Sequence, residues 1–529
     1  MAARRVTLAL DLGTSGAKVA LVEEGGAVLG FEGVPVETHV TPDGGAEQAP
    51  EDWWRGFVEA ARRLLARGLC ARDEVAAVCC STQGEGTVPV DRDGRPLMNC
   101  ILWMDMRGAG PLARQFRGLV NLAGASLPRV LRWLRITGGM PSMTGKDPAG
   151  HMLLVRDRFP DVYERTHKFL NVLDWMNLRL TGRMVATHDS ILTSWVTDNR
   201  DADRIRYHPA LVRDCGIDAA KLPEIVPCTA VLGPLRREAA EALGLPSGVR
   251  VVAGAIDNTA AAIGSGAVAD GALHLYLGTS TWMAAHVPVK KTDLRSAMAS
   301  VPCALPGRWL LTALQTTAGG NLAFLRDKIV YHRDALLREA GVPDVFKVMD
   351  RIAAEVPAGS NGVLYTPWIW GERAPVEDRT LRAGILNLSL ENDRADLVRA
   401  FLEGVALNSR WLLGPVTRFI GRAPERIRLV GGGAASDVWC QIYADVLGVE
   451  VLQVLDPVQT NARGAGFIAA AGLGWLDLRE VEARVPVHRT YAPLPAHRAV
   501  YDERFEVFTE AYRRLAPLYR RLNARAHAR

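Results

Sequence analysis

The first 26 residues alternate between apolar runs and small residues in a pattern that predicts a β-hairpin. Residues 6–10 are mostly apolar, residues 13–16 read Gly-Thr-Ser-Gly, and residues 17–22 are again mostly apolar before a second glycine turn at residues 25 and 26. Strand-length runs joined by a glycine turn are typical of hairpins. The pattern places Asp11 at the end of a buried strand, beside the tip of the hairpin.

A similar strand and turn recur in the second half of the chain. Leu-Gly-Thr-Ser stands at residues 12–15 and again at 277–280, each time after a strand-like run, with an offset of 277 − 12 = 265 residues. A repeat at half the chain length predicts two related domains, since a solenoid would repeat at a far shorter period. A chance match of four residues is the alternative; the matched strand context favours duplication.

The remaining pattern predicts an α/β chain with two domains, residues 1–255 and 256–529. The helix and strand expectations are a helix at 51–69, a strand at 75–80, a mostly helical region at 109–240, strands at 249–255, 426–430 and 449–455, an amphipathic helix at 394–413, and a basic, solvated terminal helix at 503–529.

Size and composition fit two ordinary globular domains with one cleft between them. The chain has 529 residues, 48% hydrophobic and 23% charged, and a formal charge of +5 from 63 basic and 58 acidic residues. Both proportions are normal for globular domains, each large enough to bury a core. Because a nucleic-acid binder concentrates basic residues on one face, the near balance of charge argues against nucleic acid as a partner.

The cysteines and the apolar stretches indicate a cytoplasmic protein. The eight cysteines include no Cys-x-x-Cys pair, and the adjacent Cys79 and Cys80 lie in an apolar run, which predicts buried core thiols. The first apolar run is too short for a signal peptide. The longest apolar stretch, residues 249–277, is interrupted by Asp257, Asn258 and Asp270, so no membrane span is expected.

The first glycine turn carries residues suited to phosphoryl transfer. That chemistry needs backbone amides around phosphates, a carboxylate near Mg²⁺, and a base beside the attacking hydroxyl. The amides and hydroxyls of Thr14 and Ser15 can close on anionic oxygens, Lys18 can reach the same phosphates, and Asp11 can hold Mg²⁺ through water. The alternative is an ordinary hairpin turn beside a surface carboxylate. Gly278 and Thr279 form the second such turn, and two related hairpins would bring both turns to one cleft.

Asp257 is the candidate general base. It follows a strand within a stretch of small, weakly polar residues, where a carboxylate is costly unless it has a partner or a function. As a base it would take the proton from the attacking hydroxyl. The local sequence favours a second interpretation, in which Asp257 and Asn258 cap a helix at residues 259–263.

The glycine cluster at residues 431–433 allows a rival function. It follows a strand, opens a helix, and precedes a second strand that ends at Asp456, which approaches the dinucleotide-binding fingerprint of an oxidoreductase. The third glycine position is Ser436, however, and an adenosine site explains the cluster equally well. A Walker-type loop is absent, because Gly145-Lys146 is followed by Asp147 and preceded by Met140 at the other glycine position.

In their order along the chain, six motifs resemble the FGGY family of carbohydrate kinases, and xylulokinases carry the nearest pattern. The six motifs are residues 11–16, 101–107 (Ile-Leu-Trp-Met-Asp-Met-Arg), Asp257-Asn258, 277–280, 371–375 (Gly-Glu-Arg-Ala-Pro) and 431–439 with Ala444-Asp445.

The resemblance implies a fold, an activity and a set of site residues. It implies two ribonuclease-H-like domains of the actin-like ATPase and sugar-kinase type, which close over substrate and exclude water. The first domain would bind a small sugar or polyol and the second ATP or ADP, with Mg²⁺ as the metal. The implied roles are the general base for Asp257; Mg²⁺ for Asp11; the phosphates for Thr14, Ser15, Lys18, Gly278 and Thr279; the nucleoside for Gly319, Gly432, Gly433 and Asp437; and the sugar site for Gly84, Glu85, Trp103, Asp105, Asp257 and Asn258.

The sequence departs from the family pattern in the sugar site. Xylulokinases carry Met-His after the glutamine that corresponds to Gln83, and glycerol kinases carry Arg-Glu, whereas this chain has Gly84-Glu85. Glu85 would accept hydrogen bonds where an imidazole could also donate them. The sugar or polyol, the hydroxyl that is phosphorylated and the oligomeric state, a homodimer included, stay open. A non-kinase ATPase of the actin-like fold is the alternative from another functional class.

Overall fold

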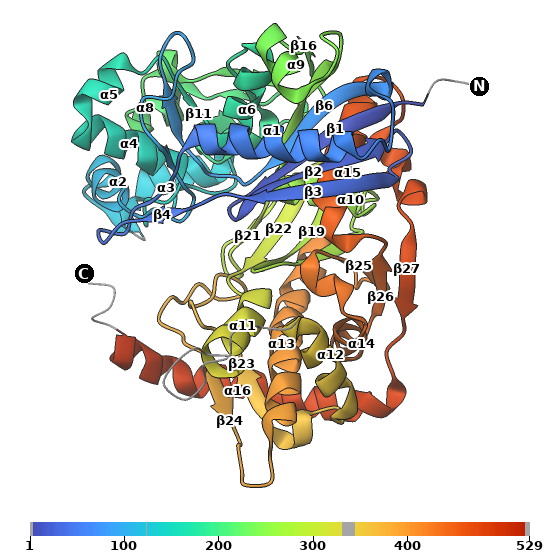
Figure 1. The fold of residues 1–529 in the computed structure, drawn as a ribbon. Coiled ribbons are helices and arrows are strands. Elements are labelled where there is room, and N and C mark those ends of the chain that lie inside the picture. Colours follow the sequence, from blue (N-terminus) through green and yellow to red (C-terminus); the bar gives the residue numbers. More distant parts are fainter. Residues whose placement is uncertain (1–3, 123, 331–343, 524–529) are drawn as a thin grey trace.

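The computed structural model describes residues 4–122, 124–330 and 344–523 and has two α/β domains, each built around one mixed sheet (Figure 1). The first domain, blue to green in Figure 1, contains the six-stranded sheet, and the second, yellow to red, contains the eight-stranded sheet. Within the described residues no helix combines the length and the apolar content needed to cross a bilayer.

The first sheet is an antiparallel meander extended by parallel strands. Strand β1 runs antiparallel to β2 and parallel to β6, and β6 runs parallel to β17. Its strands in order are β16 (Val231–Pro234), β17 (Arg250–Ile256), β6 (Val75–Thr82), β1 (Val6–Gly13), β2 (Gly16–Glu23) and β3 (Val28–Pro35). Gly13 lies opposite Gly16, which leaves Thr14 and Ser15 at the tip. The expected hairpin is confirmed.

The second sheet repeats this topology. Strand β18 runs antiparallel to β19 and parallel to β25, and β25 runs parallel to β26. Its strands in order are β27 (Val487–Tyr491), β26 (Glu450–Val454), β25 (Arg426–Val430), β18 (Leu273–Leu277), β19 (Thr281–Val287), β22 (Trp309–Gln315), β21 (Met298–Pro302) and β20 (Thr292–Asp293). The first six match the six strands of the other sheet in order and direction. This match confirms the two related domains that the sequence repeat predicted and the ribonuclease-H-like fold that the family resemblance implied.

Side chains along β1 and β2 alternate between the two faces of the first sheet, and their sizes determine which helices can cover each face. Large apolar residues such as Leu8 and Leu10 point to one face, while Ala9 and Ala20 point to the other. Helices α1 (Pro50–Ala66), α6 (Val172–Thr181) and α9 (Arg237–Leu243) cover the first face. The alanine face lets α15 (Thr460–Gly472), a helix from the second half of the chain, pack closely on β1, β2, β6 and β17.

The region between residues 109 and 240 is less helical than the sequence predicts. Its helices, besides α6 and α9, are α2 (Ala109–Phe116), α3 (Leu127–Ile136), α4 (Pro148–Arg158), α5 (Pro160–Arg165), α7 (His188–Leu192) and α8 (Pro209–Cys215). Short strands lie between them: β9 (Asn121–Leu122), β10 (Ala125–Ser126), β11 (Lys168–Leu170), β12 (Val185–Thr187), β13 (Thr197–Asp198), β14 (Arg206–Tyr207) and β15 (Glu224–Val226). Strands of two or three residues are too short to show an alternating pattern.

Two helices of the second domain differ from expectation. Helix α13 (Arg394–Ile420) is longer than predicted and buried on most sides. Helix α16 (Arg498–Asn523) is not simply solvated, because Tyr501 and Phe508 are buried in the core. Residues 524–529 of that prediction lie outside the described residues. The other helices are α11 (Gly319–Phe324), α12 (Val345–Glu355) and α14 (Asp437–Leu447), and β23 (Leu364–Thr366) pairs with β24 (Gly384–Leu386).

Helix α10 (Asp257–Gly264) crosses α15 where the two domains meet. A Cβ on Gly264 would lie 1.9 Å from the carbonyl oxygen of Thr460, and one on Gly464 would lie 1.9 Å from that of Ala260. Glycine at both positions therefore allows the two backbones to touch. The predicted domain boundary near residue 255 stays a prediction.

Candidate active site

The predicted site residues of the first domain lie at one edge of its sheet. Strands β1, β6 and β17 are parallel, so their carboxyl ends meet at the same edge. Asp11 lies near the end of β1, Gly84 and Glu85 follow β6, and Asp257 follows β17. Topology thus brings together residues that are up to 246 positions apart in sequence (257 − 11).

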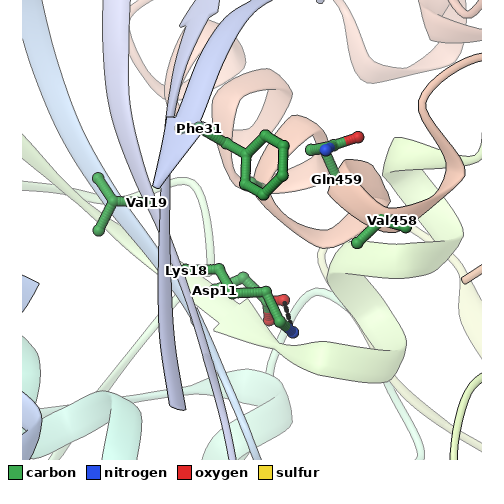
Figure 2. A pocket seen from close by; sticks show the side chains of 8 residues that line it. Asp11, Lys18, Val19, Phe31, Val458 and Gln459 are labelled. Carbon is green, nitrogen blue, oxygen red and sulfur yellow. Dashed lines mark hydrogen bonds and ion pairs between the residues drawn. The ribbon is translucent and has the colours of Figure 1, made fainter. Parts of the chain in front are cut away.

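Asp11 is buried and held from both domains. Lys18, its partner in the β1–β2 register, places Nζ 3.0 Å from Oδ2, and Asn461 of α15 donates from Nδ2 to Oδ1 at 3.2 Å. Figure 2 shows this ion pair beside a small pocket, with Phe31 on one side and Val458 and Gln459 on the other. Gln459 belongs to the short helical segment η6 (Pro457–Gln459). The pocket therefore lies between strands of the first domain and a segment of the second.

Asp257 is the first residue of α10, and the residue at the N-cap position is Ile256. The alternative interpretation of Asp257 as the helix cap is therefore wrong by one position. Its Oδ1 accepts a hydrogen bond from the backbone N–H of Asn258 at 2.7 Å. Burial, followed by the charge of Asp11, raises the pKa of the Asp257 carboxyl to about 7. The N–H of Asn258 lowers this pKa, and the charges of Glu85 and Lys18 have weaker, opposite effects on it. A carboxylate with this pKa can exchange a proton near neutral pH.

The first turn is fixed by a chain of polar side chains. Thr14 donates from Oγ1 to Oε1 of Gln83 at 2.7 Å and accepts from Nε1 of Trp103 at 3.0 Å. Gln48 donates from Nε2 to the Thr14 carbonyl at 2.7 Å. The Thr14 hydroxyl donates its proton to the hydrogen bond with Gln83 in this arrangement, whereas Ser15 is exposed at the tip. Gln48 was not predicted from the sequence, because its contacts with the turn and with Gln83 are made over 34 and 35 residues.

Gly84 and Glu85 form a loop that packs beside Asp257. A Cβ on Gly84 would touch Ile256, with Cδ1 3.5 Å away, and Glu85 has a positive φ of 60°. Glu85 is the second largest cause, after burial, of the pKa of about 7 at Asp147, and it counteracts the lowering of the Lys146 pKa that burial produces. Lys146 and Asp147, at the start of α4, are thus neighbours of Glu85 that sequence analysis did not select.

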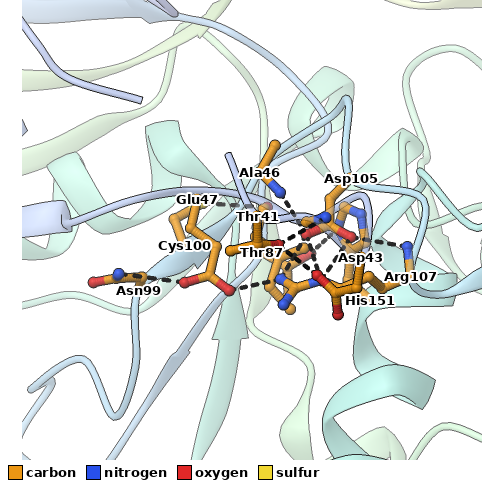
Figure 3. A network of polar contacts seen from close by, with 12 residues as sticks. Thr41, Asp43, Ala46, Glu47, Thr87, Asn99, Cys100, Asp105, Arg107 and His151 are labelled. Atoms are coloured by element: carbon orange, nitrogen blue, oxygen red, sulfur yellow. Dashed lines mark hydrogen bonds and ion pairs between the residues drawn. The ribbon is translucent and has the colours of Figure 1, made fainter. Parts of the chain in front are cut away.

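Trp103 and Asp105 lie on the segment that follows the short strand β8 (Cys100–Ile101). Trp103 is partly exposed and contacts the first turn. Asp105 is fully buried; it accepts hydrogen bonds from the backbone of Ala46 and from the guanidinium of Arg107, which also binds Glu47 (Figure 3). Its carboxylate fixes this segment, and its place in a sugar site stays a prediction.

The second turn supports the start of α11. Gly278 donates its N–H to the Ser280 carbonyl at 3.0 Å and accepts from the N–H of Gly319 at 2.8 Å. Ala318 and Gly320 donate to the Thr279 carbonyl at 2.8 and 3.0 Å. Thr279 itself is exposed. The structure thus places Gly319 against Gly278 and Thr279, the two predicted residues of the second turn.

Gly432, Gly433 and Asp437 lie where β25 ends, next to the end of β18. Around Gly432 there is open space, whereas a Cβ on Gly433 would lie 2.5 Å from the side chain of Leu277. Asp437 begins α14 and accepts from Nε2 of Gln453 at 3.2 Å. The two glycines therefore have different surroundings, one open and one packed.

Tyr276 of the second hairpin lies near enough to Asp11 of the first for the Asp11 charge to affect its hydroxyl. It stacks on Trp282 with ring centroids 4.0 Å apart, and its pKa is raised by burial and then by the charges of Asp11 and Asp257. The offset of the repeat pairs it with Asp11 (11 + 265 = 276). Sequence analysis missed Tyr276, although the repeat contained the signal.

Comparisons with known proteins agree with this arrangement. The model of the N-terminal domain of the FGGY family of carbohydrate kinases matches residues 6–264, and that of its C-terminal domain matches residues 273–473. The chain is 26% identical over 511 residues to a xylulose kinase of Bacillus subtilis, covering 96% of this chain and 97% of that protein. It is 28% identical over 520 residues to a xylulose kinase of Escherichia coli, covering 97% and 99%.

Solved structures show the same fold. A gluconate kinase from Lactobacillus acidophilus superposes with a TM-score of 0.83 at 23% identity, over 98% of this chain and all of that one. A xylulose kinase from Rhodospirillum rubrum superposes with a TM-score of 0.79 at 27% identity, over 97% of this chain and all of that one.

Proposed function

Because the chain belongs to the FGGY family of carbohydrate kinases, we propose that it transfers the γ-phosphoryl group of ATP to a hydroxyl group of a xylulose-like ketose. The observation that carries the proposal is the position of Asp257, whose pKa is raised to about 7 beside Asp11, Glu85 and Lys18. Residues 1–255 supply the sugar side and residues 256–529 the nucleotide side.

Asp257 is the general base of the proposed reaction. The acceptor hydroxyl gives its proton to the Asp257 carboxylate while its oxygen forms a bond to the γ-phosphorus and the bond to ADP breaks. A base with a pKa near the working pH is present in its deprotonated form and still accepts a proton readily. Asn258 supports this role, since its N–H keeps one carboxylate oxygen in place.

The two turns hold the phosphates in this proposal. Lys18, Ser15 and Thr279 are the groups with exposed or partly exposed polar atoms, while Thr14 and Gly278 keep the turns in shape through the contacts described above. The open space at Gly432 admits a nucleoside, and Gly433, Gly319 and Asp437 form its surroundings.

Asp11 fits a site for Mg²⁺ that is held largely through water and phosphate. Its oxygens are hydrogen-bonded by Lys18 and Asn461, and its charge acts on Asp257. Among the described residues, no group of three His, Cys, Asp or Glu side chains forms a complete metal cage. Mg²⁺ commonly binds one or two carboxylates and completes its shell with water and phosphate oxygens. When bound, it neutralises charge on the transferring phosphates.

The acceptor side suits a neutral, hydroxyl-rich molecule. Glu85 contributes negative charge, and Lys146 and Arg373 contribute positive charge. Asp147, whose pKa is raised to about 7, can donate or accept a hydrogen bond near neutral pH. Such balanced groups can accept from and donate to hydroxyls, whereas a phosphorylated sugar needs an excess of positive charge. The names of the relatives favour a ketose, with Glu85 in the place of the histidine that xylulokinases carry.

A coupled assay of ADP release across ketoses, aldoses, polyols and sugar acids tests this function. We expect ADP release only with a polyhydroxylated acceptor, highest with a ketose such as xylulose, and a loss of about 10²–10⁴-fold in Asp257→Asn. ADP release that no acceptor stimulates would instead indicate an actin-like ATPase. Light scattering tests the predicted homodimer, and cell fractionation tests the predicted cytoplasmic location.

A further inference from the structure

The strand that leads to Asp257 loses its sheet neighbour just before the site. Strand β16 pairs with β17 only as far as Val252. Beyond that point the N–H of Gly254 donates to the carbonyl of Cys228 at 3.0 Å, and the N–H of Ile256 donates to Oδ2 of Asp189 at 2.9 Å. A side-chain carboxylate thus supplies the last acceptor along this side of β17.

The hydrogen bond from Ile256 to Asp189 matters for the end of β17 because the strand is irregular there. Its register with β6 shifts between Val252 and Ala255, and Gly254 has a φ of 79°. A Cβ at Gly254 would lie 2.1 Å from the carbonyl oxygen of Cys80. A bulge changes the direction of the residues that follow it, so the direction of Asp257 depends on how the strand is held after the bulge.

Asp189 is unusually placed for a carboxylate. It is 0% exposed and accepts from Oγ1 of Thr187 at 2.6 Å and from Sγ of Cys228 at 3.3 Å, in addition to Ile256. Among the described residues, no Lys, Arg or His is paired with it. Burial raises the pKa of its carboxyl, and the three donors, together with the side chain of Thr259, counteract that effect. A buried carboxylate without a cation is costly, and three donors converging on one acceptor group offset that cost.

Ile256, which the Asp189 hydrogen bond holds in place, contacts both the Gly84–Glu85 loop and Asp257. Its side chain packs on Gly84, with Cδ1 3.5 Å from the position of a Cβ there, and its carbonyl carbon is bonded to Asp257. A shift of the Ile256 backbone therefore displaces the proposed base and the Gly84–Glu85 loop together.

We propose that Asp189 is a positioning residue for phosphoryl transfer: by accepting the Ile256 N–H it sets the direction in which Asp257 leaves β17. The inference rests on the proposed function. It places in the reaction a residue 68 positions before the base (257 − 189), on the short helix α7. Asp189 has no need to touch substrate, because its effect passes through one backbone hydrogen bond.

Asp189→Asn tests the inference, with Asp174→Asn as a matched control. Asparagine offers one acceptor oxygen to the three donors, so its NH₂ group must face at least one of them. Asp174 is also 0% exposed and belongs to the same polar network through Ser190, but it has no contact with Ile256. Both variants are expected to lower Tm.

Only Asp189→Asn is expected to separate kcat from KM. Its kcat should fall at least about tenfold, since misplacing a catalytic group by about 1 Å can cost about 10²-fold, while KM for ATP stays within about twofold. Asp174→Asn should keep both constants near wild type. A wild-type kcat in Asp189→Asn, or an equal fall in kcat in Asp174→Asn, overturns the inference.

Two further measurements keep the test decisive. Wild-type activity is measured first with the best acceptor, because its absence refutes the proposed function and not the role of Asp189. If Asp189→Asn does not fold, Cys228→Ala removes one of the three donors with little change in volume. We expect a smaller fall in kcat with KM for ATP unchanged, and an unchanged kcat counts against the inference.

Discussion

The side chain of Asn461 donates a hydrogen bond of 3.2 Å to Asp11, although the two residues are 450 positions apart in the chain. Asp11 ends the first strand of one domain, and Asn461 lies in the first turn of α15, which follows the last parallel strand of the other. The proposed metal-binding carboxylate is thus held by Lys18 of its own hairpin and by a residue of the second domain. The arrangement of the domains and the geometry of the phosphate site are therefore linked.

Replacing Asn461 should weaken both domain contact and catalysis. Asn461→Ala removes a hydrogen bond to a charged acceptor, a change of about 1.5–3 kcal/mol, so Tm should fall and kcat should drop with it. Asn461→Asp should be worse, because a second carboxylate would then stand beside Asp11. Thermal unfolding and steady-state kinetics measure both effects.

Gln459→Ala is the control for Asn461. Gln459 lines the pocket beside Asp11, and its side-chain Oε1 has no hydrogen-bond partner among the described residues. We expect this variant to keep the wild-type Tm and kcat. If Asn461→Ala also behaved as wild type, the contact with Asp11 would have no energetic role.

The raised pKa of Asp257 predicts a stability that depends on pH. Its carboxyl has a pKa of about 7 in the folded protein and about 3.9 when unfolded, so the folded state binds the extra proton between about pH 4 and pH 7. Ionisation therefore costs stability progressively as the pH rises through this window, and the full cost is present above pH 7. Asp257→Asn should raise Tm relative to wild type, and more at pH 8 than at pH 5. An equal difference in Tm at both values would mean that the carboxyl is not perturbed.

Local patterns were enough to predict the hairpins, the duplication and the strands β6, β17, β25 and β26, although not their parallel pairing. The hairpin at Thr14 and Ser15 was predictable because an apolar run, a glycine turn and a second run are neighbours in sequence. The edge strands and the short strands between residues 109 and 240 were not predictable, since two or three residues are too few to show the alternation of apolar and polar residues that marks a strand. The cap of α10 was misplaced because Ile256, which precedes the helix, has no side chain that can cap it, so residue type did not mark the start of the helix.

The candidate site was predictable only in part. Asp11, Lys18 and Asp257 carry chemistry in recognisable turns, and the parallel strands bring them together. Asn461 and Asp189 escaped notice because their importance comes from a single contact made over 450 and 67 residues. Such contacts depend on tertiary packing, which composition and spacing do not encode in a readable way.

The crossing of α10 and α15 should tolerate no side chain at Gly464. A Cβ there would lie 1.9 Å from the backbone oxygen of Ala260, which cannot move without separating the helices. Gly464→Ala should cost more than about 3 kcal/mol, seen as a large fall in Tm or as loss of folded protein. Gly248→Ala is the control, because nothing lies within 4 Å of its Cβ position. A small effect at Gly464 would show that the helices can move apart.

Substitutions of Gly432 and Gly433, the two glycines after β25, test nucleotide binding and packing separately. At Gly432 a methyl group would enter open space, which is the space proposed for the nucleoside. Gly432→Ala should therefore raise KM for ATP severalfold while the free energy of unfolding changes by less than about 0.5 kcal/mol. At Gly433 a methyl group would lie 2.5 Å from Leu277 and 2.8 Å from Trp439, so Gly433→Ala should cost about 1–3 kcal/mol of stability. Nucleotide titration and thermal unfolding of both variants check this contrast. Unchanged ATP affinity in Gly432→Ala would place the nucleoside elsewhere, and unchanged stability in Gly433→Ala would mean that β18 can yield to a methyl group.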